Sequence, residues 1–372
     1  MSASERIRSR RGFTLIELMV SAAVLGIIVF YLTNVLVQQS RSYEVVDDVT
    51  EIQQSLRAIG DLMEREARAT GMLVQEGAAV CGIDNDAFGS DIVFLTDSAA
   101  INPANLTDAG LGVSVTGGYT GAGVDNLSLN RRALEPNQAM VAYDNDAPLN
   151  GVADSDFFWP GAGIGQGVIL TDKKNPSRGA QCGIITQVTR VGLSNLTVQV
   201  DWTMRIGVNV HVPAPAGLGP VPVGAGAPDL VVVPANAYLI DRTVPNQPRL
   251  WRNGTILADD VEDLQVAYFH DANADGIVQP GEWSGDTAAT PYAANAVDNS
   301  DLRAVRLDLV LRTPQQDVAV LQNPNLGFGL RPQLENAPAS VGPPDGFRRR
   351  VQVRTVRPRN VGLRGNAYSG SL

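Results

Sequence analysis

The sequence predicts an α+β protein in which one long N-terminal helix precedes a head built on an antiparallel β-sheet. Up to residue 69 apolar residues recur at helical spacing, and the first proline of the chain is Pro103. From residue 90 onward this period disappears, and short β-branched or alternating runs replace it. With 372 residues, of which 44% are hydrophobic and 18% charged, the chain can bury a sizeable core.

The predicted helix begins with an apolar run from Leu18 to Val37, which is interrupted by three polar residues: Ser21, Thr33 and Asn34. At a rise of about 1.5 Å per residue this run would span about 30 Å, the hydrocarbon thickness of a membrane. Residues 1–12 are polar and carry four arginines against one glutamate: Arg6, Arg8, Arg10, Arg11 and Glu5. This positive flank predicts that they lie in the cytoplasm. No small-residue cleavage site of a secretory signal follows, so a plain signal anchor is the simplest interpretation.

Glu17 does not fit a plain anchor. It lies at the head of the apolar run, where a carboxylate without a partner costs about 2.5 kcal/mol or more, depending on depth. The sequence therefore predicts that Glu17 has a partner.

The helical pattern continues beyond the apolar run as a stripe at spacings of three and four residues: Val45, Val49, Ile52, Leu56, Ile59 and Met63. We interpret this stripe as ordinary core packing and not as a cofactor site. Residues 13–40 are predicted to be the hydrophobic transmembrane part of the helix. Residues 41–70 are predicted to be its amphipathic part, and residues 71–372 a β-rich globular head.

Within the head, short runs typical of strands are distributed along the chain: 91–95, 112–116, 126–129, 167–171, 183–188, 196–202, 230–233 and 238–240. The strongest hairpin signal is Asn253-Gly254 between residues 249–252 and 255–258, because Asn-Gly favours a two-residue type I′ turn. Strands at 261–269 and 304–313 follow, and the second of these alternates apolar and charged residues, as in a sheet with one wet face. Residues 212–228 are rich in Pro and Gly and predict an extended loop, with a domain boundary as the alternative.

A calcium loop is the clearest candidate site in the head. Residues 271–282 fit D-x-[DN]-x-[DN]-G-x₅-E at every defined position, with Gly276 at the sharp turn. The spacing supplies the oxygen ligands that Ca²⁺ prefers, from Asp271, Asn273, Asp275, the Ile277 carbonyl and Glu282. We expect a structural Ca²⁺ on a β scaffold, and a solvated acidic turn is the alternative.

The sequence offers few other residues for a disulfide, a metal site or catalysis. Cys81 and Cys182 would both lie outside the cytoplasm, where a disulfide can form, and two unpaired buried thiols are the alternative. No nucleophile elbow, P-loop or H-E-x-x-H motif is present in the sequence, and we expect no enzymatic activity. A net charge of −10 argues against nucleic acid as a partner of the whole protein. The arginines between residues 348 and 364 could nevertheless serve subunit docking, or form an exposed strand face.

The N-terminal stretch Gly12-Phe13-Thr14-Leu15-Ile16-Glu17 resembles the class III signal of type IV prepilins and type II secretion pseudopilins. The resemblance implies cleavage after Gly12 by a prepilin peptidase and N-methylation of the new terminus at Phe13. It also implies that Glu17 pairs with the N-terminal amine of a neighbouring subunit. The expected fold is then type IV pilin-like, with large loop insertions in the head.

The helix end at 58–71 followed by Cys81, and the ending at 353–360, resemble the PilW family of minor pilins. The hairpin with Val261–Phe269 resembles the sheet of PilW and of the J-type pseudopilins. The family implies a non-enzymatic pilus subunit that helps to initiate assembly, with a possible place at the tip. Its expected partners are other minor pilins, the major pilin and the inner membrane before assembly. The head would lie in the periplasm and later on the extracellular pilus. A J-type pseudopilin of a type II secretion system, or an adhesin or ligand-binding head on a pilin anchor, are the alternatives.

Overall fold

The structure is a computed structural model. It describes residues 14–71, 79–84, 90–96, 113–114, 124–130, 167–172, 180–191, 195–201, 208–209, 230–244, 246–271, 273, 275, 277, 279, 282–285, 302–322, 330–335, 337 and 345–361. The predicted cleavage site, the Pro/Gly-rich loop 212–228 and most of the inserts at 97–160 and 284–300 lie outside these residues. The chain divides into two compact units, Met1–Glu51 and Ile52–Leu372, and each is described separately.

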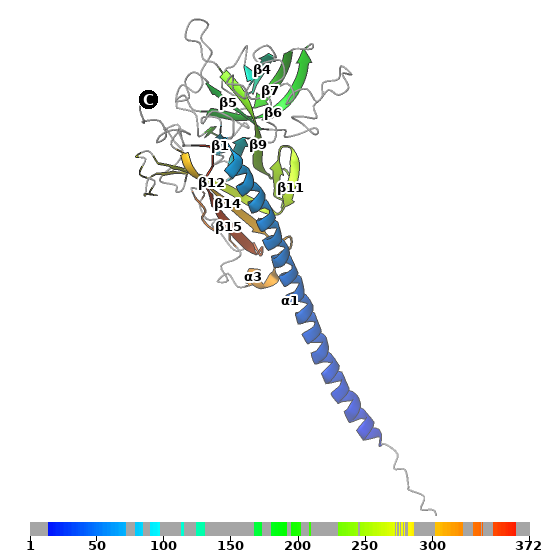
Figure 1. The fold of residues 1–372 in the computed structure, drawn as a ribbon. Helices are drawn as coiled ribbons and strands as arrows, with labels where there is room; N and C mark the ends of the chain where they lie inside the picture. The colour runs from blue at the N-terminus through cyan, green and yellow to red at the C-terminus, as the bar shows by residue number, and fades with distance from the viewer. Residues whose placement is uncertain are drawn as a thin grey trace, which may run out of the picture. The chain divides into compact units, whose positions relative to one another are not determined.

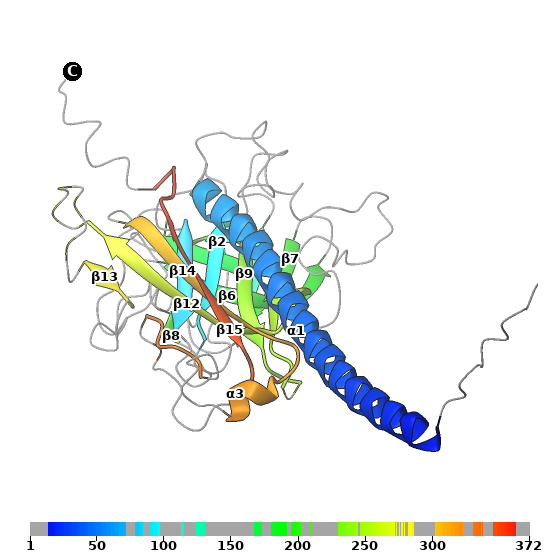
Figure 2. The same ribbon diagram turned by 90° about the horizontal axis from the view of Figure 1, so that it is seen from below.

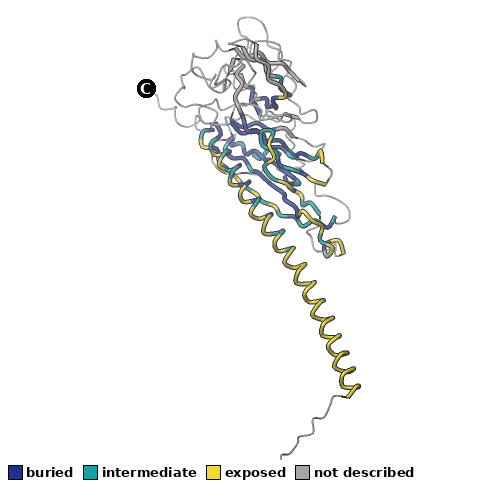
Figure 3. Tube along the Cα trace, turned by 90° about the vertical axis from the view of Figure 1, so that its right-hand side faces the viewer, coloured by how far each residue is buried: buried dark blue, intermediate teal, exposed yellow. Residues whose placement is uncertain are grey.

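The predicted long helix is present as α1, Leu15–Ala69. The helix has no proline, and four of its hydroxyl side chains bond back to their own helix, as Thr50 Oγ1 does to Val46 O at 2.7 Å. Its buried residues begin at Ile52, which is also where the second unit begins. Figure 3 shows this change along the helix, from exposed residues to alternating buried and exposed ones.

The described strands of the head form two antiparallel sheets (Figure 1). The first sheet has the order β4-β7-β6-β5-β9-β2-β1-β8, with β3 and the β10-β11 hairpin attached to β9. Its strands are β1 Val80–Asp84, β2 Ile92–Thr96, β3 Val113–Ser114, β4 Val124–Asn130, β5 Gly167–Asp172, β6 Ala180–Val191, β7 Asn195–Asp201, β8 Val208–Asn209, β9 Leu230–Asp241, β10 Arg249–Arg252 and β11 Thr255–Asp259.

The second sheet has the order β13-β12-β14-β15 and carries the helix. Its strands are β12 Val261–His270, β13 Trp283–Ser284, β14 Leu302–Arg312 and β15 Arg349–Val356, and the short helix α3, Val318–Gln322, precedes β15. One face of β12 and β14 shares a core with the last turns of α1, and Figure 2 shows these elements side by side. The core includes Ile52, Leu56, Ile59, Met63, Leu264, Val266, Tyr268, Val305, Leu307 and Leu309.

Two features of the strands differ from the sequence prediction. The runs at 230–233 and 238–240 are one continuous strand, β9, which passes through Pro234 and pairs with β5, β3, β2 and β10 along its length. The expected strand at 112–116 is described only as Val113–Ser114. The predicted hairpin is confirmed, because Asn253 and Gly254 take positive φ values of 48° and 80° between β10 and β11.

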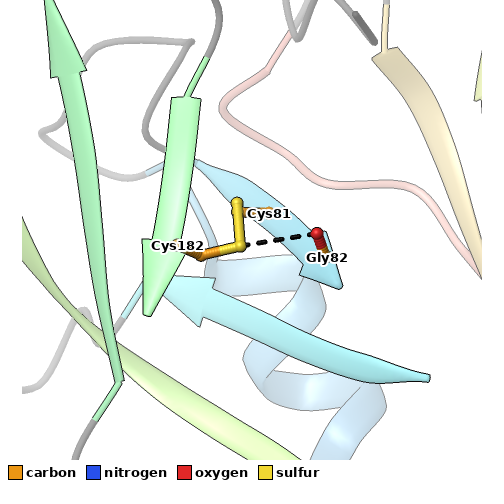
Figure 4. Close-up of a disulfide and its surroundings, with 3 residues drawn as sticks. All are labelled: Cys81, Gly82 and Cys182. Carbon is orange, nitrogen blue, oxygen red and sulfur yellow. Dashed lines mark hydrogen bonds between the residues drawn. A yellow bond between two sulfur atoms is a disulfide. The ribbon is translucent and has the colours of Figure 1, made fainter. Parts of the chain in front are cut away.

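A disulfide joins Cys81 on β1 to Cys182 on β6, with a Cα–Cα distance of 5.9 Å and both residues fully buried (Figure 4). In the sheet order β5, β9 and β2 lie between these strands. A flat sheet would separate them by about 19 Å, at roughly 4.8 Å per strand. The first sheet therefore curls until β1 meets β6, and the disulfide closes the curl. The Gly82 carbonyl oxygen lies 3.5 Å from Cys182 Sγ, as a contact, because an oxidised sulfur has no proton to donate.

Candidate functional site

The apolar segment of α1 exposes its large side chains. Leu15, Leu25, Phe30 and Tyr31 are each more than three-fifths exposed. In the described part of the chain, α1 is long and apolar enough to cross a membrane. Its serine and threonine hydroxyl groups are satisfied locally, since Ser21 Oγ donates to Glu17 O at 2.7 Å and Thr33 Oγ1 to Val29 O at 2.8 Å. Such a segment needs lipid or other apolar helices around it.

Glu17 forms a capping box at the start of α1. Thr14 N donates to Glu17 Oε2 at 2.9 Å and Thr14 Oγ1 donates to the same oxygen at 3.0 Å, while Glu17 N donates to Thr14 Oγ1 at 3.3 Å. Threonine at the cap and glutamate three residues later satisfy amides that the first turn leaves open. Within this single chain, the contact of the Glu17 carboxylate is therefore with Thr14. Gly12 and Phe13 lie outside the described residues.

A charged cluster fixes the end of α1 to the first sheet. Glu66 accepts from Tyr238 Oη on β9 at 2.5 Å and from Arg252 Nη2 on β10 at 2.7 Å. Burial, reinforced by the Glu66 carboxylate, raises the pKa of Tyr238 far above its ordinary value of 10.0, so its hydroxyl remains a donor. No sequence pattern pointed to this cluster, because its members are 14 to 186 residues apart.

The segment that follows β15 caps the C-terminal end of α1. Arg359 N donates to Arg68 O at 3.2 Å, and Asn360 Nδ2 donates to Ala69 O at 3.4 Å and to Thr70 O at 3.3 Å. Gly71, with φ of +77°, ends the helix in the left-handed conformation that favours glycine. The last carbonyls of α1 are thus satisfied by the segment that follows β15.

The last strand of the second sheet contacts α1 directly. Gln352, with its amide nitrogen toward the helix, donates to Leu56 O at 2.6 Å, and a Cβ on Gly60 would collide with this side chain. Arg354 binds Glu64 at 2.8 Å and Asp61 at 3.0 Å. Part of the arginine cluster expected near the C-terminus thus serves to hold the helix.

The opposite face of the second sheet buries a set of charged groups. Asp263 on β12 is fully buried and binds Arg331 at 3.0 Å and Ser90 Oγ at 2.7 Å. Asp308 on β14 is 4% exposed, and Arg306 forms a two-pronged ion pair with Glu335 beside it. Burial first, and then the charge of Glu335, raises the pKa of Asp308 from 3.8 to about 8, although Arg306 opposes the shift.

The predicted calcium loop connects β12 to β13, and its base is closed by His270 N, which donates to Glu282 O at 2.8 Å. Asp275 N donates to Asp271 Oδ1 and to Asn273 Oδ1, both at 3.0 Å, which brings these two side chains to one amide. Glu282 Oε2 accepts from Gln279 N at 2.9 Å. Among the described residues, no three His, Cys, Asp or Glu side chains converge as they would around a bound metal ion. The side chains that would supply ligands thus hold the loop through its own amides.

Comparisons with known proteins agree with these features. Residues 225–360 match the family model described as Type IV Pilus-assembly protein W, and residues 7–32 match that of the prokaryotic N-terminal methylation motif. The chain is a PilW-like minor pilin. In this PilW-like pilin, the first match covers the strands from β9 to β15, and the second covers the leader and the start of α1. It is a structural subunit of a type IV pilus, anchored through its apolar helix.

Among solved structures, the type IV-like pilin TTHA1219 from Thermus thermophilus matches the PilW-like chain with 16% sequence identity. The match covers 53% of this chain and 84% of that one, with a TM-score of 0.23, a likeness too low to establish a shared fold. No curated protein matches the chain. The architecture of this chain, a long N-terminal helix followed by antiparallel sheets, is that expected of a pilin.

Proposed function

We propose that this minor pilin helps to initiate type IV pilus assembly, stays near the pilus tip and catalyses no reaction. The observation that carries the proposal is the exposed apolar helix with a capped carboxylate at its head, in a chain whose second sheet matches the PilW model. Before assembly the helix lies in the inner membrane, with residues 1–12 in the cytoplasm and the head in the periplasm. After assembly the subunit is part of the extracellular filament.

Processing precedes assembly in this proposal. The prepilin peptidase cleaves after Gly12, and the new terminus at Phe13 is methylated, as the match to the methylation motif over residues 7–32 supports. The capping pair Thr14 and Glu17 lies entirely on the mature side of this cleavage. The mature helix therefore keeps its N-terminal cap.

Glu17 then has two tasks. Within its own chain it accepts from the Thr14 amide, and in the filament it neutralises the N-terminal amine of a neighbouring subunit. A carboxylate has two oxygens, and Glu17 Oε2 takes both bonds from Thr14. Both tasks are compatible if Oε1 faces the neighbour's amine. In an apolar filament core that amine would otherwise be buried without a counter-charge, at a high cost in free energy.

Two substitutions of Glu17 separate these tasks. Glu17→Gln keeps an oxygen for the Thr14 amide but has no charge, whereas Glu17→Ala loses both. We expect both variants to be processed and to fold, and both to be incorporated into pili at less than about a tenth of the wild-type level, because a buried unpaired amine costs more than 1.4 kcal/mol. The measurement is the amount of the subunit in sheared filaments relative to the membrane fraction.

Ser21→Ala is the matched control, because Ser21 bonds only within the helix and lies one turn further along. Its incorporation should equal that of the wild type. If Glu17→Gln is incorporated normally while Glu17→Ala is not, the cap and not the charge is what assembly requires. The charge-neutralisation part of the proposal would then fail.

The pilus is favoured over a type II secretion machine, because the matched family model is described by pilus assembly and covers the helix-bearing sheet. A deletion strain separates the two. We expect loss of twitching motility with normal export of secreted proteins, and loss of export with normal twitching would point to a pseudopilin. An adhesin role of the head is a further alternative, and loss of surface attachment in a strain with normal piliation would favour it.

We also propose that the loop between β12 and β13 binds a structural Ca²⁺. The ligands would be the side chains of Asp271, Asn273, Asp275 and Glu282 and the Ile277 carbonyl. All of them are oxygen atoms, which Ca²⁺ prefers as ligands. Asp271 is nearly buried at the end of β12, and the Asp275 amide already draws Asp271 and Asn273 together. Bound Ca²⁺ would fix the connection between the two strands.

Calcium should stabilise the folded protein. With free Ca²⁺ at about a hundred times its dissociation constant, the free energy of unfolding should rise by about 2.7 kcal/mol, because the ion binds only the folded loop. The measurement is urea unfolding of the protein in detergent micelles, with Ca²⁺ or with a chelator.

Asp275→Ser with Glu282→Gln should abolish the calcium effect. Asp259→Asn, at an exposed carboxylate on β11, should leave it unchanged. An identical unfolding curve with Ca²⁺ and with chelator would contradict the calcium site. The segment 271–282 would then be a solvated acidic turn.

A further inference from the structure

Arg303 on β14 lies beside the loop between β12 and β13, where the calcium site is proposed. Arg303 Nε is 3.8 Å from Asp271 Oδ2, and 4% of the Asp271 side chain is exposed. Asp271 is the first residue of the calcium motif. The same carboxylate is therefore an expected calcium ligand and the partner of an arginine.

A β-bulge in β14 directs Arg303 to this carboxylate. In the register between the two strands, one step along β12 corresponds to two residues on β14, from Ala304 to Leu302. Arg303 is the extra residue of this bulge, and bulges beside functional sites re-aim a side chain. In a regular strand Arg303 would share a face with Val305, which belongs to the core beneath α1. The bulge instead places Leu302 in that core and leaves Arg303 beside Asp271.

The two oxygens of Asp271 have different contacts. Oδ1 accepts from the Asp275 amide at 3.0 Å, and Oδ2 faces Arg303 Nε. At 3.8 Å the contact with Arg303 is an ion pair and too long for a hydrogen bond. Asp271 can therefore turn Oδ2 to a metal ion without breaking a hydrogen bond to this nitrogen. The positive charge of Arg303 nevertheless stays next to the ion.

The charges around the loop set the size of this effect. Asp271, Asp275 and Glu282 carry three negative charges, and Arg303 offsets one of them. The affinity of such loops depends on the charge of their ligands. With a calcium–oxygen distance of about 2.4 Å, the ion would lie about 6 Å from the guanidinium. At that distance the repulsion weakens binding about tenfold, even at the dielectric constant of water.

We propose that Arg303 is the counter-charge of Asp271 in the calcium-free protein and lowers the affinity of the loop for calcium. This inference rests on the calcium site proposed above, and it adds the residue that sets how much calcium the loop requires. Arg306, the next arginine on β14, is bound to Glu335 and does not take this part. The loop then loads where free calcium is plentiful, as extracellular modules with dissociation constants of about 10⁻⁴–10⁻³ M do.

Calorimetric titration of the full chain in detergent micelles with Ca²⁺ tests the proposal. Arg303→Gln should bind about tenfold more tightly than the wild type, and Arg303→Lys, which keeps the charge, should bind about as the wild type does. Arg249→Gln is the matched control, because Arg249 pairs with Asp259 at 3.3 Å and its side chain is as exposed as that of Arg303. Asp259 precedes the start of β12, at the end opposite to the loop. The control should bind calcium with wild-type affinity.

The outcomes of the titration separate the role of Arg303 from the calcium site itself. Binding by the wild type, with equal or weaker binding by Arg303→Gln, would overturn the role of Arg303 and leave the calcium site in place. Binding by Arg303→Gln but not by the wild type would support both. Absence of binding by the wild type and by every variant would contradict both.

Urea unfolding gives a readout that a merely structural role of Arg303 would not change. In chelator, Arg303→Gln should be less stable than the wild type, because a nearly buried carboxylate loses a counter-charge. In saturating Ca²⁺ the difference should shift in favour of the variant by about 1.4 kcal/mol, which corresponds to its tenfold higher affinity. A loss of stability that is the same in chelator and in calcium would overturn the proposal.

Discussion

Loss of the disulfide between Cys81 and Cys182 is expected to lower the free energy of unfolding by about 4–5 kcal/mol. In the chain-entropy model, a cross-link that closes a loop of about 100 residues lowers the entropy of the unfolded chain, and this raises its free energy by about 4–5 kcal/mol. The two cysteines are 101 positions apart and fully buried. Urea unfolding of the oxidised and the reduced protein in detergent micelles measures the difference. The slope against urea should also increase on reduction, because a chain without the cross-link exposes more surface when it unfolds.

Alanine variants provide the control for reduction. Cys81→Ala and Cys182→Ala, singly and together, should all lose about the same stability as reduction, since each breaks the same loop. If the single variants behave like the oxidised wild type, the disulfide does not contribute to stability. If the double variant loses much more than reduction does, the cavity left by the missing sulfur atoms dominates over the cross-link.

The second large effect is a dependence of stability on pH that originates from Asp308. Its pKa is 3.8 ordinarily and about 8 in the folded protein, because the carboxyl is buried beside Glu335. Between these values the folded chain holds a proton that the unfolded chain has released, so raising the pH favours unfolding. The free energy of unfolding should therefore fall from about pH 5 to about pH 8, by up to about 1.4 kcal/mol per pH unit. Burial also raises the pKa of Asp263, which acts in the same direction.

Asp308→Asn should flatten this dependence, because an amide keeps the size of the side chain and does not titrate. Urea unfolding at a series of pH values measures the slope for the variant and the wild type. Asp317→Asn is a suitable comparison, since it removes a carboxylate that binds Arg348 near the surface and should leave the slope in place. A wild-type stability that rises with pH over this range would contradict the assignment.

The helix and several strands were predictable because each depends on a local pattern. The spacing of Ile52, Leu56, Ile59 and Met63 identified the buried side of α1, and Asn253-Gly254 identified the hairpin. β9 was not predicted as one strand, because proline normally interrupts a strand pattern. Pro234 is accommodated because β9 changes partners there, from β5 to β2.

The groups that position the helix and the buried charges were not predictable from the sequence. Glu66, Tyr238 and Arg252 meet only because α1, β9 and β10 converge, and none of the three stands in a recognisable motif. Asp308 alternates with leucines on β14 as a residue on a wet face would, yet it is buried. The segment that carries Arg331 and Glu335 lies over that face and buries it.

The Asn253-Gly254 turn also bears on how the protein ages chemically. In such a pair the glycine amide nitrogen can attack the asparagine side-chain carbonyl, which closes a succinimide and releases ammonia. Here Asn253 Oδ1 accepts from Ala237 N at 2.9 Å, and Asn253 Nδ2 donates to Asn236 Oδ1 at 2.6 Å, so the side chain is fixed against β9. Deamidation at this position requires the hairpin to detach, and isoaspartate at residue 253 therefore records how often it does so.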